Sequence, residues 1–348
     1  MAMYWNEFMD LLCSSPGLIV ASVMIVILMF VNGWTDAPNA VACCISTRAL
    51  PPRKAVRLAV VMNFFGVLAI SVVSSTIAKS MIQLVDFGTG DALITLKAGM
   101  AAAVIWSMGS WVIRMPTSKS HALMAGMTGA GIALQNSWSG INAQEWGKVF
   151  YGVLISAVVG LGGGWILSKG IEWAAGGLDR RKAAPFLKGG QIAASAAVAF
   201  LHGAQDGQKY MGIMMLAIFL SQGKEPVSDI SIPIWLMILA SVAMALGTSM
   251  GGYRIIRTLG FDLVKMEVYH GFAADVAAAV SLFISTAAGY PVSTTHTKTT
   301  AIIGVGVSQG LRAVNWRMVR EILWIWILTV PCCGVLGYFL AKFVFRLL

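Results

Sequence analysis

The sequence carries little charge for its length. Only 11% of its 348 residues are charged, 57% are hydrophobic, and the mean hydropathy is +0.77. Average globular chains hold about 25% charged residues, so this composition excludes a soluble domain. The alternation over segments of about ten residues that marks transmembrane strands is also missing, which leaves helices as the membrane-crossing elements.

Cysteine is scarce and lacks the spacing of metal ligands. The five cysteines include the adjacent pairs Cys43–Cys44 and Cys332–Cys333, in or beside apolar segments. Adjacent cysteines rarely form a bridge, so we interpret them as small buried packing residues. We also expect no cleaved signal peptide, because the start "MAMYWNEFMD" is acidic and the first apolar run is long enough to remain in the membrane.

Long apolar runs, in contrast, are abundant. A helix needs about 20 apolar residues to cross a bilayer, and about ten segments reach that length. They cover roughly residues 16–35, 55–78, 92–113, 116–134, 148–170, 190–221, 231–251, 267–288, 291–311 and 320–345. We predict an all-α polytopic protein of the cytoplasmic membrane, with about 10–12 membrane segments once re-entrant hairpins are counted.

The net charge of +10 is concentrated on one side of the predicted topology. The connections after the odd-numbered segments contain Arg48, Arg53, Lys54, Arg57, Arg114, Lys169, Arg180, Arg181, Lys182, Lys188, Arg254, Arg257, Lys265, Arg312, Arg317 and Arg320. The opposite side contains Lys79, Lys148, Lys224, Lys342 and Arg346. Because basic loops stay in the cytoplasm, we predict that both termini lie outside. The charge reflects topology and does not indicate a nucleic-acid partner.

Two motifs occur twice, in the same order. The stretch "FVNGWTDAPNAVA" at 30–42 aligns with "FLHGAQDGQKYMG" at 200–212, an offset of 170 residues. The stretch "MPTSKSHALMAGMTGAGI" at 115–132 aligns with "YPVSTTHTKTTAIIGVGV" at 290–307, an offset of 175 residues. Two motifs at nearly one offset indicate an internal duplication of the chain.

The duplication divides the chain into a first repeat at 1–175, a charged cytoplasmic linker at 176–189 and a second repeat at 190–348. Each repeat holds five of the apolar segments, and an odd number places the second repeat upside down in the membrane. Inverted repeats with broken helices build many secondary transporters, whose sites lie at the repeat interface near the bilayer midplane. Asp36 and Asp206, which align, should therefore face each other across a pseudo-two-fold axis.

The aspartate motifs predict a cation site. Glycine and proline in "GWTDAPNA" should break the helix, and the backbone groups freed there need a protein-lined cavity. Hard cations prefer oxygen ligands, which Asp36, Asn39, Asp206 and Gln208 supply. Asp275, a further intramembrane carboxylate, is a candidate for cation or proton binding. Alternatively, Asp36 forms a structural bridge with a nearby lysine or arginine.

The second pair of motifs, "PTSKSH" and "PVSTTH", predicts an anion site. A proline precedes small hydroxyl or cationic residues that would occupy the first turn of a helix, where free N–H groups and the positive helix end attract anions. The candidate ligands are Ser118, Lys119, Ser120, Ser293, Thr294 and Thr295. Plain helix capping by serine and threonine is the alternative.

His121 and His296 close the two anion motifs at matched positions. Proton relay and helix packing both explain a histidine there. Lys209 and Lys298 lie beside the motifs without a lysine at the matching position of the other repeat, and the sequence leaves their roles open.

A cation site and an anion site at one midplane predict cation–oxyanion symport, because a bound cation or a proton removes the repulsion between the carboxylates and the oxyanion. Another tetrahedral oxyanion, such as sulfate, is the nearest alternative substrate. A passive channel and an intramembrane hydrolase are further alternatives. The hydrolase is disfavoured because a serine nucleophile would normally occur once, whereas the Ser–His motifs occur in both repeats.

These residues resemble the inorganic phosphate transporter family. The family signature Gly-x-x-Asp-x-x-Asn-Ala is met by Gly33, Asp36, Asn39 and Ala40. The stretches "HGAQDGQKYMG", "PTSKSHAL", "PVSTTH" and "STRALPPRKAV" are similar to further family segments, so the similarity runs essentially end to end. The departures from the family pattern are Lys119, Gln205, Asp275 and Lys298.

The resemblance implies a bacterial low-affinity phosphate permease and not an enzyme. Inorganic phosphate would bind between the Ser/Thr hairpin tips and the aspartate motifs, and would enter the cell together with Na⁺ or H⁺. We expect no cofactor, with Na⁺ as a candidate coupling ion at Asp36, Asn39 and Asp206. The expected partners are phosphate and membrane lipid, and we allow for a homodimer.

Overall fold

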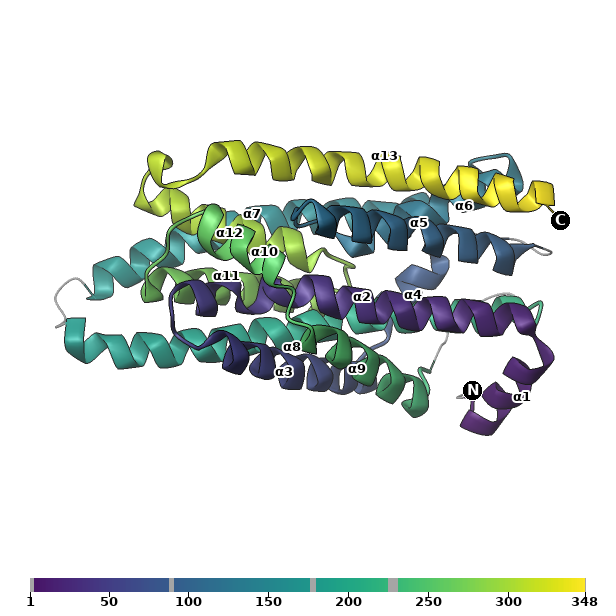
Figure 1. Cartoon of the computed structure of the whole chain (residues 1–348), viewed down its shortest axis with the longest axis horizontal. Helices are drawn as coiled ribbons and strands as arrows, with labels where there is room; N and C mark the ends of the chain where they lie inside the picture. The colour runs from purple at the N-terminus through teal and green to yellow at the C-terminus, as the bar shows by residue number, and fades with distance from the viewer. Residues whose placement is uncertain (1–2, 88–90, 176–179, 225–230, 348) are drawn as a thin grey trace.

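The computed structural model describes residues 3–87, 91–175, 180–224 and 231–347. Over these residues the chain is almost entirely helical, and its β structure consists of two isolated antiparallel bridges, Val85–Ile141 and Val264–Val314. The long helices run roughly along the longest axis of the molecule (Figure 1). The predicted all-α class is confirmed.

The first part of the chain forms seven helices within the described residues. Their bounds are α1 Trp5–Ser14, α2 Pro16–Ser46, α3 Pro52–Val73, α4 Thr76–Gln83, α5 Ala92–Val112, α6 Lys119–Gln135 and α7 Ala143–Ala175. Pro16 and Pro52 open α2 and α3, where the missing N–H group would have had no intrahelical acceptor. Asn136, in the left-handed conformation at φ 50°, ends α6.

The second part repeats this order. It contains α8 Arg180–Ser221, α9 Ile234–Ser249, α10 Tyr253–Arg257, the π-helical turn η1 Thr258–Asp262, α11 Val268–Ala287, α12 Thr294–Gln309, the 3₁₀ turn η2 Leu311–Ala313 and α13 Trp316–Leu347. Of the predicted linker, residues 176–179 lie outside the described residues, and 180–189 form the start of α8. The turns that lead into α6 and α12 each contain a left-handed residue, Arg114 at φ 64° and Gly289 at φ 72°.

Seven described helices are long and apolar enough to cross a membrane, namely α2, α3, α5, α7, α8, α11 and α13. The bent pair of α9 with α10 and η1 makes an eighth candidate. The predicted segments at 116–134 and 291–311 are absent from this count. They correspond to α6 and α12, which have only 17 and 16 residues and pack against α5 and α11 as the second arms of two hairpins.

The helix interruption does not lie at the aspartate motif, where we predicted it. α2 continues through residues 33–40, whereas a bend of 61° separates α9 from α10 and η1. Gly33 serves close packing instead: a Cβ atom there would lie 2.2 Å from the Met244 carbonyl oxygen of α9. Its repeat mate Gly203 meets the Asn63 carbonyl oxygen of α3 in the same way, at 2.3 Å. The glycines therefore admit neighbouring backbones and do not break the helices.

The two hairpins enter the molecule from opposite ends. α5 and α6 lie toward one end of the long axis, and α11 and α12 lie toward the other (Figure 1). The helices α1 and α13 bring the first and last described residues to the same end of the molecule, and the end of α7 and the start of α8 lie at the opposite end (Figure 1). This arrangement suits the predicted inverted topology, and the side that faces the cytoplasm stays a prediction.

Candidate functional site

Four helices bring polar side chains into the buried centre of the molecule. This central cluster consists of Asn32, Asp36 and Asn39 on α2, Lys119 and Ser120 on α6, His202, Asp206 and Lys209 on α8, and Thr295 on α12. None of these residues is more than 4% exposed. Ionisable groups inside a membrane are costly and mark functional sites by default.

Asp36 pairs with the lysine of the first anion motif. The Nζ atom of Lys119 lies 2.7 Å from Oδ1 of Asp36, and both side chains are 3% exposed. Lys119 also donates a hydrogen bond to the Thr117 carbonyl oxygen at 3.3 Å. This contact matches the alternative interpretation, in which Asp36 forms a structural bridge with a nearby lysine or arginine. The lysine, Lys119, is itself one of the predicted ligands of the anion site.

Asp206 contacts more groups than Asp36. The Nζ atom of Lys209 donates to its Oδ1 at 2.7 Å, and Nδ2 of Asn32 donates to its Oδ2 at 3.0 Å. Nε2 of His202 lies 3.4 Å from Oδ2, and the Ser120 hydroxyl donates to Oδ1 at 3.5 Å. Hydrogen bonds from an ammonium group to a carboxylate are among the strong ones, so Asp206 is firmly placed.

The two aligned aspartates lie close together, one on α2 and one on α8. One ligand atom each from Asp36, His202 and Asp206 lies within 4.8 Å of the others. The carbonyl oxygen Oδ1 of Asn39 has no hydrogen-bond partner among the described residues. The two carboxylates and the imidazole therefore lie close enough together to hold a metal ion.

Further hydrogen bonds tie the two repeats together. Nδ2 of Asn39 donates to the Thr295 hydroxyl at 2.9 Å, which joins α2 to α12. Nζ of Lys209 donates to the Ser120 hydroxyl at 2.8 Å and to the Val292 carbonyl oxygen at 2.5 Å. Each hairpin tip is therefore bonded to a helix of the other repeat.

Ser118 and Ser293 cap α6 and α12. Their hydroxyl oxygens accept hydrogen bonds from the N–H groups of His121 and His296, each at 3.2 Å. Both serines therefore cap their helices, as the alternative interpretation expects. The N–H groups of the first two residues of each helix, which include Thr294, have no acceptor within their own helix. These helix starts can still bind an anion.

His121 and His296 pack ring against ring. Their ring centroids are 4.9 Å apart, and the ring of His296 lies 3.8 Å from that of Trp326. Both histidines line an apolar cavity of about 620 Å³ bordered by α7 and α13. Within the described part of the chain, neither ring nitrogen of His296 has a hydrogen-bond partner, nor does Nε2 of His121. These contacts favour the packing interpretation over proton relay.

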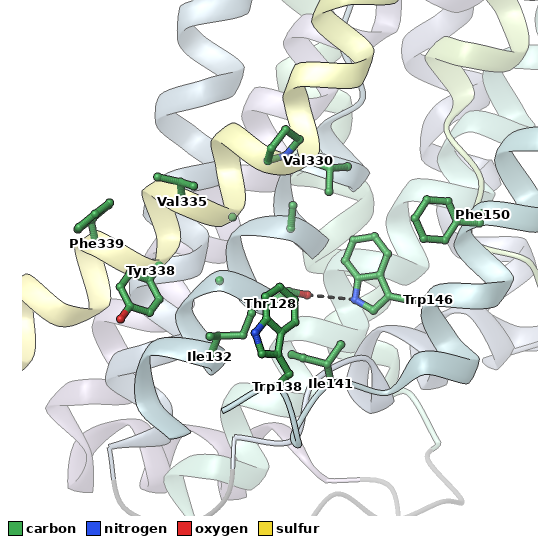
Figure 2. Close-up of a pocket in the computed structure, with 14 residues that line it drawn as sticks. Thr128, Ile132, Trp138, Ile141, Trp146, Phe150, Val330, Val335, Tyr338 and Phe339 are labelled. Carbon is green, nitrogen blue, oxygen red and sulfur yellow. Dashed lines mark hydrogen bonds between the residues drawn. The ribbon is translucent and has the colours of Figure 1, made fainter. Parts of the chain in front are cut away.

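A neighbouring cavity of about 600 Å³ lies between α6, α7 and α13 (Figure 2). Trp146, Phe150 and Val330 line both cavities. The indole N–H of Trp146 donates to the Thr128 hydroxyl at 3.2 Å, as the dashed line in Figure 2 shows. Neither carboxylates nor lysines occur among the described lining residues. These apolar cavities suit hydrocarbon, so we place the functional site at the central cluster.

Asp275 does not join the central cluster. It pairs with Lys298 and accepts a hydrogen bond from Ser195, which also contacts the Cys44 sulfur at 3.0 Å. With a rise of 1.5 Å per residue, Ser195 lies about 16 Å from Asp206 along α8. The structure therefore places Asp275 in a separate buried cluster, and its role in ion coupling stays a prediction.

Gln208 also points away from the other predicted ligands. It is buried, and in the described structure neither amide atom of its side chain has a hydrogen-bond partner. Residues two positions apart on an α-helix are separated by about 200°, so Gln208 and Asp206 lie on different faces of α8. The structure does not bring Gln208 into contact with the cluster.

The sequence reasoning overlooked Asn32 and gave no role to His202 and Lys209. All three contact Asp206. The repeat alignment contained a usable signal, because Asn32 aligns with His202, four residues before each aspartate. A position one helical turn before an aspartate lies on the same face, which lets His202 contact Asp206 within α8, whereas Asn32 reaches Asp206 from α2.

Comparisons with known proteins identify the family of the chain. The model of the phosphate transporter family matches residues 32–177 and 173–337. A probable low-affinity inorganic phosphate transporter of Bacillus subtilis is 33% identical over 335 residues, which cover 94% of this chain and 99% of that protein. A protein of the same description from Rhizobium meliloti is 34% identical over 345 residues, which cover 97% and 100%.

A solved structure with a similar fold is titled "The sodium-dependent phosphate transporter". Its TM-score is 0.85 at 21% identity, and the match covers 96% of this chain and 100% of that one. At this identity the likeness shows the fold alone. The sequence relatives are named as transporters and not as enzymes. Since the family model matches nearly the whole length, this multi-pass membrane protein belongs to the phosphate transporter family.

Proposed function

We propose that this chain is a secondary transporter that imports inorganic phosphate across the cytoplasmic membrane by symport with Na⁺ or H⁺. The central cluster is the proposed site. The observation that carries the proposal is the meeting of two lysine–aspartate pairs with two helix starts from opposite repeats at one buried place.

Phosphate would bind between the starts of α6 and α12. The free N–H groups and the positive end of each helix attract an oxyanion. Hydrogen bonds to charged groups contribute about 1.5–3 kcal/mol each. Lys119 adds a cationic donor, and Ser120 and Thr295 add hydroxyl groups. Because the two helix starts come from inverted repeats, they approach a tetrahedral anion from opposite sides.

Charge balance supports a coupling cation. The carboxylates of Asp36 and Asp206 are matched by the ammonium groups of Lys119 and Lys209. A phosphate anion added to this cluster brings negative charge without a partner, and burying an unpaired ion costs several kcal/mol. A Na⁺ ion or a proton that enters with phosphate removes this excess. The unpaired amide oxygen of Asn39 and the carboxylates are suitable ligands for Na⁺.

Uptake into proteoliposomes tests the proposal. Sodium and pH gradients are imposed separately, and we expect one of them to drive accumulation of radiolabelled phosphate against its gradient. An excess of sulfate, the alternative oxyanion, should compete weakly. Phosphate that only moves down its own gradient would contradict symport and support a channel. Inhibition by sulfate as strong as that by unlabelled phosphate would contradict the proposal that phosphate is the preferred substrate.

The orientation has its own test. Most basic connections lie on the side of the linker at 176–189, so we propose that this side is cytoplasmic. A reporter inserted at 178–188 should be accessible only from the cytoplasm, and tags on both termini only from outside. Labelling of the linker from the exterior of intact cells would contradict this orientation.

A further inference from the structure

The two lysines of the central cluster are held differently, and Lys209 is the more constrained. Its Nζ atom contacts Oδ1 of Asp206 at 2.7 Å, the Ser120 hydroxyl at 2.8 Å and the Val292 carbonyl oxygen at 2.5 Å. An ammonium group has three hydrogens to donate, so all those of Lys209 are engaged. Moving Lys209 would break three contacts at once.

Lys119 has fewer contacts. Its Nζ atom touches Asp36 at 2.7 Å and donates to the Thr117 carbonyl oxygen at 3.3 Å. Thr117 belongs to the turn that precedes α6, so this second contact does not tie Lys119 to another helix. Among the described contacts, Asp36 alone joins Lys119 to the rest of the cluster.

The two aspartates differ in the same way. Asp206 has Asn32 and His202 as neighbours in addition to its lysine. For Asp36, Lys119 is the only cation in direct contact that the described residues provide. The other titratable groups that face Asp36 are His202, Asp206 and Tyr210, all on α8. Asp36 would therefore lose its charge partner if Lys119 moved.

Lys119 lies where phosphate would arrive. It is the first residue of α6, so its side chain starts beside the free N–H groups of that helix. Lysine carries a compact charge on a flexible stem, and a change of rotamer moves the ammonium group without moving the helix. A phosphate at this helix start competes with Asp36 for the same ammonium group.

We propose that Lys119 is a mobile counter-charge that couples the two transported ions. Without phosphate, Lys119 neutralises Asp36. When phosphate binds at the start of α6, Lys119 turns to the phosphate, and the coupling cation, Na⁺ or H⁺, takes its place on Asp36. Lys209 stays on Asp206 throughout. This inference rests on the proposed function, because it assumes that phosphate and a cation share the central cluster.

The exchange makes the two binding events depend on each other. One ammonium group cannot neutralise both anions, so phosphate without the cation leaves Asp36 buried and unpaired. The cation without phosphate has to displace Lys119. Each ion therefore raises the affinity for the other, and linkage requires the two factors to be equal.

Equilibrium binding of radiolabelled phosphate to the purified full-length chain tests the exchange without relying on transport. Affinity is measured with and without Na⁺ in one arm, and at low and high pH in the other. We expect the coupling cation to raise phosphate affinity at least about tenfold in the wild type, or about 1.4 kcal/mol. Asp36→Asn should bind phosphate without cation dependence, as tightly as the wild type with saturating cation. The matched variant Asp206→Asn should keep its cation dependence, because Lys209 has two further acceptors.

The outcomes separate the two proposals. If the wild type depends on a cation and Asp36→Asn still binds weakly or still depends on it, the exchange is wrong and symport stands. If phosphate binding to the wild type ignores both Na⁺ and pH, symport and the exchange are both wrong. If Asp36→Asn does not fold, Lys119→Met provides a second readout. In the absence of phosphate, the affinity of Lys119→Met for the coupling cation, measured by calorimetry, should exceed that of the wild type at least about tenfold. An unchanged cation affinity would overturn the exchange.

Discussion

The described part of the chain contains two buried clusters of charge that differ in their relation to the repeats. The central cluster takes its aspartates, Asp36 and Asp206, from aligned positions of both repeats. The pair of Asp275 with Lys298 occurs in the second repeat. At an offset of 175 residues, the first repeat has Met100 and Leu123 instead, and both are fully buried.

This difference distinguishes charges that both repeats contribute to one site from charges that belong to a single repeat. In a transporter built from inverted repeats, the halves rock around one fixed site as it opens to either side. The aspartates of this site recur in both repeats, whereas its lysines do not. Asp275 and Lys298 pair with each other on α11 and α12, apart from this site, so we expect them to affect stability more than phosphate binding.

The largest effect should come from the aligned aspartates. Asp36→Asn and Asp206→Asn should each lower ion-driven phosphate uptake in proteoliposomes at least about 100-fold, equivalent to about 2.7 kcal/mol. The reason is that each variant removes a carboxylate that the cation or a lysine needs. Asp262→Asn, in an exposed part of the chain, is the control and should retain uptake. Normal cation-driven uptake by both cluster variants would show that the aspartates are not the coupling groups.

The pair of Asp275 and Lys298, which has no charged counterpart in the first repeat, offers the second test. Asp275→Met or Lys298→Leu alone should lower the free energy of unfolding by about 3–5 kcal/mol, because each leaves one buried charge without a partner. The double variant, which copies the first repeat, should be about as stable as the wild type. Denaturant unfolding in detergent, followed by tryptophan fluorescence, measures both. A double variant no more stable than the single ones would refute the comparison.

The two lysines of the central cluster should separate binding from stability. Lys119→Met should weaken phosphate affinity roughly ten- to a hundredfold, because it removes one charged hydrogen bond of about 1.5–3 kcal/mol. Lys209→Met should mainly lower the yield of folded protein, since three acceptors lose their donor. Phosphate binding isotherms and gel filtration measure the two effects. Unchanged phosphate affinity in Lys119→Met would remove this lysine from the site.

The smallest effects should come from the capping serines. Ser118→Ala and Ser293→Ala should each cost about 0.5–2 kcal/mol of stability and weaken phosphate affinity at most about tenfold, or 1.4 kcal/mol. The loss of stability and the loss of affinity should each be similar in the two variants, because both serines have the same capping geometry. Ser15→Ala, which removes the cap of α2 away from the cluster, should affect stability without affecting affinity. A larger loss of affinity in only one of the two would show that the hairpin tips are not equivalent.

Much of the fold follows from the sequence by itself. The lengths of the apolar runs determine that the chain is helical and crosses a membrane, because a bilayer accepts only segments whose backbone groups are satisfied internally. The motifs around Asp36 and Asp206, and around Ser118 and Ser293, reveal the duplication because they recur in order. Proline and small hydroxyl residues are local signals, and they correctly predict helix starts at Lys119 and Thr294.

Only the tertiary structure decides which charges meet. Nothing in the sequence pairs Lys119 with Asp36, separates Asp275 from the central cluster, or carries α2 unbroken past its glycine. These outcomes depend on how helices some 170 residues apart pack against each other, whereas sequence periodicity reports only which residues share a face of one helix. A long, flexible lysine side chain can reach several carboxylates, and the surrounding packing selects one of them.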